Sequence, residues 1–256
     1  MLVSKRLQQD FGEAAERYDA YGALQRHVRA QGLALAFKHF SPAGHVLDVG
    51  AGTGAFAQEA QAMGTAWGIT SLDLAWGMCA KAKQRCCHTV QADAGALPFA
   101  DGAFSGVFSS LMLQWNDTPG EVFREISRIL APGGTAVLAT LVEGTLAELQ
   151  DAFRAVDDAQ HTRRFLPAHR LLEAAGEAGL ALRLARQNTE HEYYPDVVAL
   201  MRALQAIGAS HKQAGQGRGL LTPRKLARLE HSYRERHASA QGLRASWQLL
   251  YVVLGK

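Results

Sequence analysis

The sequence predicts an α/β protein built on a doubly wound sheet of mainly parallel strands. Three observations lead to this prediction. Short apolar runs alternate with segments of helical periodicity through the middle of the chain. The first run, His45–Val49, passes directly into a turn that contains Gly50, Gly52 and Gly54. A carboxylate, Asp73, follows the second run, at the edge where such a sheet binds its ligands.

Length and composition favour one large globular domain. The chain has 256 residues, of which 48% are hydrophobic and 20% charged, and this balance excludes a disordered chain. No segment approaches the roughly 18 consecutive apolar residues of a membrane span, and Met1–Phe11 lacks the apolar core of a secretory signal. We therefore expect a cytoplasmic protein with N-terminal helices in residues 1–40, a ligand-binding core in 41–145 and substrate-side elements in 146–256.

The sequence of the core predicts five strands, each followed by a helical segment or a turn. The expected strands are His45–Val49, Thr65–Leu72, Cys87–Gln91, Phe104–Ser110 and Thr135–Leu141. The expected helices are Ala55–Ala62, Met78–Arg85, Glu121–Leu130 and Thr145–Asp158, with a weak turn after Asp93. Because ligands bind at the carboxyl ends of the strands in such sheets, the site residues should follow the strands directly.

Further elements flank this core on both sides. Two helices, Lys5–Ala20 and Ala23–His39, are expected before it. After it we expect, in order, helix Ala168–Ala178, strand Leu182–Thr189, helices Asp196–Leu204 and Pro223–Arg236, and strand Ser246–Leu254, which brings the sheet to seven strands. Nearly sixty residues separate the last two strands, far more than a hairpin of about 2–5 residues needs. The sequence therefore predicts a helical cap inserted before the last strand.

The cysteines and the charges restrict the classes of partner. Cys79, Cys86 and Cys87 lack the paired spacing of a zinc site and the even number of a disulfide framework, so we expect reduced thiols and no metal site. The net charge is +3, but residues 1–150 hold 11 basic and 14 acidic residues, whereas residues 200–256 hold 10 and 2. A basic C-terminal region predicts an acidic partner, and a solvated basic helix face is the alternative.

The glycine-rich turn after the first strand is the sharpest motif. Glycine lets the backbone turn tightly and approach a ligand at the start of the next helix. The Gly-x-Gly-x-Gly spacing of Gly50, Gly52 and Gly54 departs from the Gly-x-Gly-x-x-Gly of dinucleotide-binding folds. Together with Asp48 it resembles motif I of the class I S-adenosylmethionine-dependent methyltransferases, which have a Rossmann-like sheet. The resemblance implies that Asp48 and the turn hold the methionine portion of S-adenosylmethionine.

Two further carboxylates support this resemblance. Asp73 lies 19 positions after Gly54, where a carboxylate can accept hydrogen bonds from both hydroxyls of a ribose. The resemblance assigns Asp93, after the third strand, to the adenine amino group, and segments 97–99, 101–104 and 130–134 match family landmarks in order. The implied cofactor-binding residues are Asp48, Gly50, Gly52, Thr53, Gly54, Asp73, Leu74, Met78, Asp93, Ala94 and Ser109.

The flanking segments indicate which methyltransferases the chain resembles. Phe11–Asp19 is a motif shared with quinone methyltransferases. More specific are Leu113–Trp115, Thr140–Leu149, Arg164–Pro167 and Ile207–His211. Over nearly the whole chain, these segments resemble the malonyl-acyl-carrier-protein O-methyltransferases of biotin synthesis. The sequence departs from that pattern at Ala51, where cysteine is common, and at Ala75–Gly77, but neither departure removes a needed polar contact.

This resemblance implies methyl transfer to the free carboxylate of a malonyl thioester. That carboxylate is ionised at pH 7, because carboxyl pKa values lie near about 4, so no general base is required. A guanidinium can orient a carboxylate through two parallel hydrogen bonds, and Arg164 is the predicted orienting cation. Tyr18, Gln114 and Trp115 are predicted to form the lid and the pocket wall.

The implied partner is an acidic acyl-carrier protein that presents malonyl-phosphopantetheine. Arg224, Lys225 and Arg228 fall on one predicted helix, with Arg224 and Arg228 on one face, and are the expected carrier-protein contacts. We expect a monomer that binds neither nucleic acid nor membrane.

Three other interpretations of the function are considered. A quinone or other small-molecule methyltransferase would have an apolar pocket without an orienting arginine. A transfer-RNA methyltransferase would use the basic region, although that region lacks interleaved aromatic residues for base stacking. A non-catalytic, cofactor-binding protein could also have this fold, because fold does not determine function.

Overall fold

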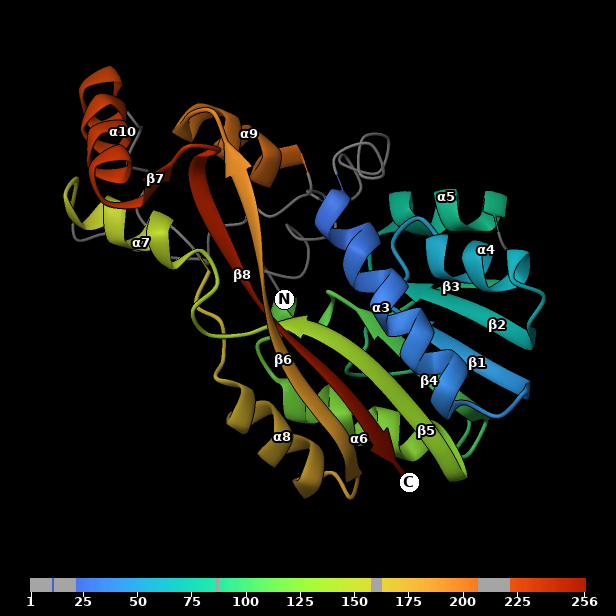
Figure 1. The fold of residues 1–256 in the computed structure, drawn as a ribbon. Helices are drawn as coiled ribbons and strands as arrows, with labels where there is room; N and C mark the ends of the chain where they lie inside the picture. The colour runs from blue at the N-terminus through green and yellow to red at the C-terminus, as the bar shows by residue number, and fades with distance from the viewer. Residues whose placement is uncertain (1–10, 12–21, 86–87, 158–162, 207–221) are drawn as a thin grey trace.

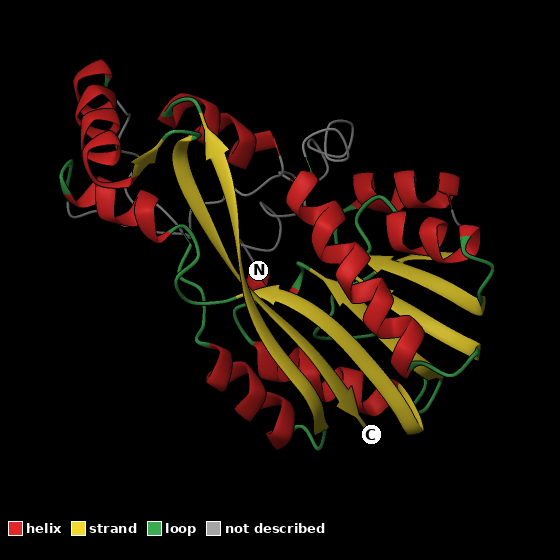
Figure 2. Cartoon of the chain, in the orientation of Figure 1, coloured by secondary structure: helices red, strands yellow, loops and turns green. Residues whose placement is uncertain are grey.

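The structure, a computed structural model, describes residue 11 and residues 22–85, 88–157, 163–206 and 222–256. A twisted sheet runs through the molecule, with helices on both faces (Figure 2). Seven strands follow one another in the order β3-β2-β1-β4-β5-β8-β6, and a short eighth strand, β7, pairs with β8. The doubly wound α/β fold and its seven main strands are confirmed.

Five neighbouring strands of the sheet are parallel. They are β1 (Ala43–Val49), β2 (Ala66–Asp73), β3 (His88–Gln91), β4 (Phe104–Ser110) and β5 (Leu130–Leu141). Strand β8 (Gly242–Gly255) lies antiparallel between β5 and β6 (Ala181–Tyr194), and β7 (Ala238–Ser239) pairs with its first residues. The order of the strands reverses between β1 and β4. The carboxyl ends of these two strands therefore form the crevice where doubly wound sheets bind ligands.

Helices cover the two faces of this sheet as separate layers (Figure 1). One layer contains α3 (Ala23–His39), α4 (Ala55–Ala62) and α5 (Trp76–Arg85), and the other contains α6 (Pro119–Ile129) and α8 (Ala168–Glu177). The apolar side chains of α6 show why it lies on the sheet. Val122, Phe123, Ile126 and Ile129 recur at helical spacing and are all buried.

A group of helices gathers at one end of the long strands β6 and β8 (Figure 1). It consists of α7 (Ala147–Arg154), α9 (Val197–Ala206) and α10 (Pro223–His237). Tyr233 of α10 is buried and its hydroxyl donates to the carbonyl oxygen of Arg244 at 2.8 Å. Arg244 in turn pairs with Glu148 of α7, with 3.0 Å between Nε and Oε1. Helices α9 and α10 lie between β6 and β8 in the chain, as the predicted cap requires.

The ends of several helices and strands differ from the predicted ones. Strands β6 and β8 are longer than predicted, because they pair with each other along most of their length, including polar residues that carry no apolar strand signal. The helix expected at Thr145–Asp158 is shorter, spanning Ala147–Arg154. Strand β7 was not predicted, since two residues carry no periodicity. The predicted helix Lys5–Ala20 lies almost wholly outside the described residues.

Candidate active site

The glycine-rich turn connects β1 to α4 at the crevice in the sheet. Gly50, Gly52 and Gly54 have φ values of 72°, 55° and 81°, a region that favours glycine. A Cβ on Gly50 would lie 2.4 Å from Cβ of Met112, so this position also needs the missing side chain. Hydrogen bonds from the backbone N–H groups of Gly50 and Ala51 to the carbonyl oxygen of Leu72, at 2.8 and 2.9 Å, fix the turn on β2.

Asp73 ends β2 and receives two backbone hydrogen bonds. Its Oδ2 accepts from the N–H of Gly52 at 2.9 Å and its Oδ1 accepts from the N–H of Ala75 at 2.8 Å. Burial raises the pKa of Asp73 to about 6, while these N–H donors act in the opposite direction. A carboxylate offers about four lone-pair positions, so Asp73 can still accept a hydroxyl hydrogen.

Asp48 lies in β1 just before the turn, and its environment differs from that of Asp73. Its side chain is buried, and Oδ2 has no hydrogen-bond partner among the described residues. Burial raises its pKa to about 8, against the lowering effect of the Arg29 guanidinium and with a further increase from Asp73. A buried carboxyl without a full set of partners fits a site that receives a cationic or hydrogen-donating group.

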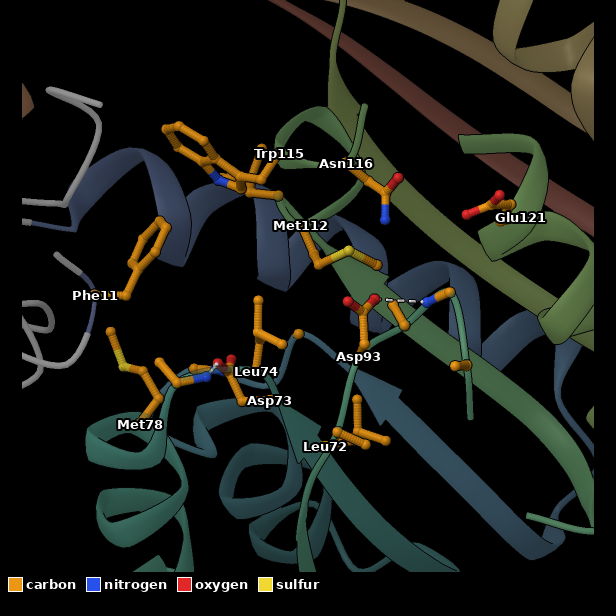
Figure 3. A pocket seen from close by; sticks show the side chains of 18 of the residues that line it. Phe11, Leu72, Asp73, Leu74, Met78, Asp93, Met112, Trp115, Asn116 and Glu121 are labelled. Carbon is orange, nitrogen blue, oxygen red and sulfur yellow. Dashed lines mark hydrogen bonds between the residues drawn. The ribbon is translucent and has the colours of Figure 1, made fainter. Parts of the chain in front are cut away.

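The segment after β4 forms the opposite wall of the site. Leu111 has a φ of 54°, a strained value for leucine, and is followed by the 3₁₀ helix η1 (Leu113–Trp115). The Trp115 ring meets the ring of Phe11 edge to face, with centroids 5.3 Å apart (Figure 3). Gln114 is turned away, because its Nε2 donates to the carbonyl oxygen of Leu111 and its Oε1 accepts from Thr140.

These elements enclose a cavity of about 410 Å³. Asp93, after β3, lies in its wall and accepts a hydrogen bond from the N–H of Gly95 at 2.9 Å (Figure 3). The acidic side chains of the lining are Asp73, Asp93, Asp117 and Glu121, and no lysine, arginine or histidine is among the described lining residues. Such a lining suits a cation that also carries hydroxyl and amino donors, as S-adenosylmethionine does.

The structure brings most of the predicted cofactor residues together. Those that line the cavity are Gly50, Gly52, Asp73, Leu74, Met78, Asp93 and Ala94. Four others are buried and do not line the cavity: Asp48, Thr53, Gly54 and Ser109. Thr53 Oγ1 accepts from Arg85 at 2.9 Å, and Ser109 Oγ donates to the carbonyl oxygen of Val49 at 2.8 Å, so both act within the protein framework.

The predicted acceptor-side residues are more scattered. Trp115 lines the cavity, whereas Gln114 does not. Arg164 is exposed and absent from the lining, while its neighbour Arg163 is buried. Tyr18 lies outside the described residues.

The predicted basic surface on α10 is partly neutralised within the chain. Lys225 Nζ pairs with Asp157 Oδ2 at 2.8 Å, and Arg228 Nη2 donates to the carbonyl oxygen of Ala155 at 2.6 Å. Arg224 is exposed. The free positive charge of this helix face is therefore smaller than a count of its basic residues indicates.

Several lining residues were not predicted from the sequence, among them Leu111, Met112 and the segment Asn116–Thr118. The positive φ of Leu111 leaves no mark in the sequence, and Met112 becomes significant only through its fit against Gly50. Arg163 carries the same sequence signal as Arg164, because both place a guanidinium in the same segment.

Fold and site define a class I S-adenosylmethionine-dependent methyltransferase. A methyltransferase-domain family matches residues 47–138. A putative methyltransferase from Bacillus halodurans superposes with a TM-score of 0.63 at 17% identity, covering 89% of this chain and 98% of that one. A geranyl diphosphate C-methyltransferase from Streptomyces coelicolor, solved with S-adenosyl-L-homocysteine, gives 0.55 at 14% identity, covering 93% and 83%.

Similarity over the full length defines the family more narrowly. The malonyl-[acyl-carrier protein] O-methyltransferase of Geobacter sulfurreducens is 33% identical over 99% of both chains, and that of Serratia marcescens is 38% identical over 87% of this chain and 86% of its own. The chain belongs to the malonyl-[acyl-carrier protein] O-methyltransferase family. It spans 50% of the biotin biosynthesis bifunctional protein BioHC of Cellvibrio japonicus, to which it is 37% identical over 98% of its own length.

None of the helices in the described part of the chain combines the length and the apolar composition that a membrane span requires.

Proposed function

We propose that this protein transfers a methyl group from S-adenosylmethionine to the free carboxylate of a malonyl group carried on an acyl-carrier protein. The product is the malonyl methyl ester that enters biotin synthesis. The observation that carries the choice of substrate is the match to malonyl-[acyl-carrier protein] O-methyltransferases over 99% of both chains. A quinone or other small-molecule acceptor is not favoured by these relatives.

The cavity lining supports S-adenosylmethionine as the methyl donor. Asp73 is held by two backbone N–H groups and would accept the ribose hydroxyls, and Asp93 would accept the adenine amino group. Asp48 would lie near the methionine portion, where a positive charge would favour its ionised form. Thr53, Gly54 and Ser109, which do not line the cavity, would fix the backbone on which these contacts depend.

The methyl transfer requires no acid or base from the protein. S-adenosylmethionine, when bound, supplies a methyl group that its sulfonium activates. The malonyl carboxylate oxygen would accept this methyl group, and the electron pair of the broken carbon–sulfur bond would remain on the sulfur. Because the carboxylate is already ionised at pH 7, the side chains of the site have no proton to remove. Their contribution is to hold donor and acceptor in line and to exclude water.

The aromatic wall supports this exclusion of water. Trp115 and Phe11 close one side of the cavity, and Tyr18 would add to this lid. Gln114 would act indirectly, since its amide joins Leu111 to Thr140 and so fixes the start of η1.

The remaining proposals concern the partner and the wider organisation. Arg224 and Arg228, on the exposed face of α10, would meet the acidic carrier protein, with Lys225 contributing less because of its ion pair with Asp157. We assign residues 41–145 to cofactor binding and residues 146–256 to the acceptor side. Monomeric state and cytoplasmic location stay predictions.

Methyl transfer from labelled S-adenosylmethionine tests the proposed function. The acceptors are malonyl-carrier protein, malonyl-coenzyme A, acetyl-carrier protein and a quinone precursor. Label on the malonyl thioesters alone is the expected result. Cofactor binding without transfer to either malonyl thioester would overturn the proposal and redirect the search to small apolar acceptors.

A further inference from the structure

Arg163 is a buried guanidinium whose hydrogen-bonding capacity is largely unused. Only 6% of its side chain is exposed. Its Nη2 donates to Oδ1 of Asp117 at 2.7 Å. Its Nε and Nη1 are buried and have no hydrogen-bond partner in the part of the chain that the structure describes. Buried donors of a charged group are rarely left unpaired, so this side chain indicates an acceptor that the protein itself does not supply.

The position of Arg163 connects it to the cavity. Asp117, its ion-pair partner, is one of the lining residues, and so is Trp115. The Arg163 Cζ lies 5.6 Å from the centroid of the Trp115 ring, in a cation–π contact. Two lining residues therefore touch the same guanidinium, which lies directly behind the wall that η1 forms.

The charge of the cavity makes this cation significant. Four carboxylates line the cavity, and none of its described lining residues is basic. Such a lining would repel an anionic acceptor, although it suits a cationic cofactor. An acceptor carboxylate needs a positive partner to replace its lost hydration. Arg163 is a buried cation that contacts the lining residue Trp115, and its Nε and Nη1 have no hydrogen-bond partner among the described residues.

We propose that Arg163 binds the free carboxylate of the acceptor and thereby selects a malonyl over an acetyl group. The proposal rests on the proposed function. Asp117 holds Nη2 and fixes the orientation of the guanidinium, while Nε and Nη1 remain for the carboxylate. The same ion pair shares the positive charge, so the carboxylate is oriented without being held so strongly that it loses its nucleophilic character.

Trp115 is the side chain that must respond when the carboxylate binds. Both free donors are closed to water in this structure. Of the two lining residues that touch the guanidinium, Asp117 binds Nη2, whereas the Trp115 ring makes only the cation–π contact. Entry of the acceptor therefore displaces this ring from Arg163. Binding of the malonyl group and rearrangement of the aromatic wall are one coupled event.

The test measures binding of carrier-linked malonyl and acetyl groups in the presence of S-adenosylhomocysteine. Contacts to the carrier protein are common to both ligands, so the ratio of their dissociation constants isolates the contribution of the carboxylate. The wild-type protein should prefer the malonyl form by about 30-fold, in keeping with a buried charge pair. Arg163→Gln should abolish this preference by weakening malonyl binding alone. Arg170→Gln, at an exposed position of α8, is the matched control and should keep the wild-type ratio. Arg164→Gln tests the cation that the sequence predicted.

Other outcomes separate the possible failures. An unchanged ratio in Arg163→Gln, or a lost ratio in Arg164→Gln, would overturn the proposal. A purely structural role would weaken both ligands and S-adenosylhomocysteine together, which also overturns it. If Arg163→Gln does not fold, Arg163→Lys decides, because lysine keeps the charge but not the planar donors and should give an intermediate ratio; a wild-type ratio there would contradict the assignment. A wild-type protein that neither prefers nor methylates malonyl groups would instead overturn the proposed function.

Discussion

The backbone N–H of Gly52 donates to Oδ2 of Asp73 at 2.9 Å, so the glycine-rich turn and the end of β2 form one unit. The residue that accepts ribose hydroxyls in our proposal therefore also fixes the loop beside it. A change at either residue should alter the other, and cofactor affinity should report on both.

Asp73→Asn should weaken cofactor binding strongly. The amide would place an N–H₂ group against one of the N–H donors of Gly52 and Ala75, and the charge would be lost. Loss of a charged hydrogen-bonding partner costs about 2 kcal/mol or more, so the dissociation constant for S-adenosylmethionine should rise at least about 30-fold. Isothermal titration calorimetry measures this change. The control Glu173→Gln, at an exposed position of α8, should bind as the wild type does, and normal affinity in Asp73→Asn would refute the assignment.

Gly50→Ala should lower both stability and cofactor affinity. The backbone at Gly50 has φ +72°, and an added Cβ would lie 2.4 Å from Cβ of Met112. Gly64 is a matched control, because it has φ +75° but nothing within 4 Å of an added Cβ. Both alanine variants suffer backbone strain of about 1 kcal/mol or more, and Gly50→Ala should lose a further 1–3 kcal/mol, roughly, from the clash. Equal unfolding free energies in urea for the two variants would contradict this account.

Asp48 should make the cofactor-free protein less stable as pH rises. Its pKa is about 8 in the folded protein against 3.8 for the unfolded reference, so the folded state binds the extra proton between these values. The unfolding free energy must then fall as pH rises from about 4 towards 8. Asp73, with a pKa of about 6, acts in the same direction over a narrower range.

Asp48→Asn removes the larger of these two effects. The variant should lose less thermal stability than the wild type between pH 5 and 8, roughly, when both are free of cofactor. It should also bind S-adenosylmethionine more weakly. Differential scanning calorimetry across this range checks the first expectation, and parallel curves for the two proteins would show that Asp48 is not the buried proton acceptor.

Trp115 and Phe11 should contribute jointly to cofactor binding. Their edge-to-face contact, with centroids 5.3 Å apart, forms one side of the cavity. Such pairs contribute about 0.5–1.5 kcal/mol beyond their buried area. A double-mutant cycle with Trp115→Ala and Phe11→Ala should give a coupling energy in that range for the cofactor dissociation constant. Strictly additive effects would mean that the two rings act independently.

Charge reversal on α10 should affect the carrier protein but not a small acceptor. Arg224→Glu should raise KM for malonyl-carrier protein about threefold to tenfold, and added salt should reduce the difference. KM for malonyl-coenzyme A should stay as in the wild type. Arg170→Glu on α8 makes the same charge change elsewhere and should leave both values unaltered. Equal losses with both acceptors would exclude carrier docking at α10.

The strands and helices of the core could be predicted because their signals are local. The predicted helices Ala23–His39 and Ala55–Ala62 coincide with α3 and α4. Strand β6 extends beyond its prediction because pairing with β8 supplies hydrogen bonds to residues such as Glu190 and Glu192, which have no strand signal of their own. Long-range pairing, which the local pattern does not contain, decided that end.

The site could be predicted on the cofactor side and less well on the acceptor side. Asp73 ends β2 and Asp93 comes two residues after β3, so their meeting at one edge is a consequence of a parallel sheet. Arg163 and Arg164 are adjacent and chemically identical, and burial alone separates them. Arg163 is the buried arginine because it packs against Asp117 and Trp115. These are tertiary contacts, which the local sequence does not reveal.

The location of the transferred methyl group decides whether the protein methylates the malonyl carboxylate. Malonyl-carrier protein is incubated with the enzyme and S-adenosylmethionine, and the intact carrier protein and its released pantetheine arm are analysed by mass spectrometry. We predict a mass gain of one methylene group, located on the free carboxylate as a methyl ester. A methyl group on any other atom of the malonyl arm, or a gain that acetyl-carrier protein also shows, would contradict it.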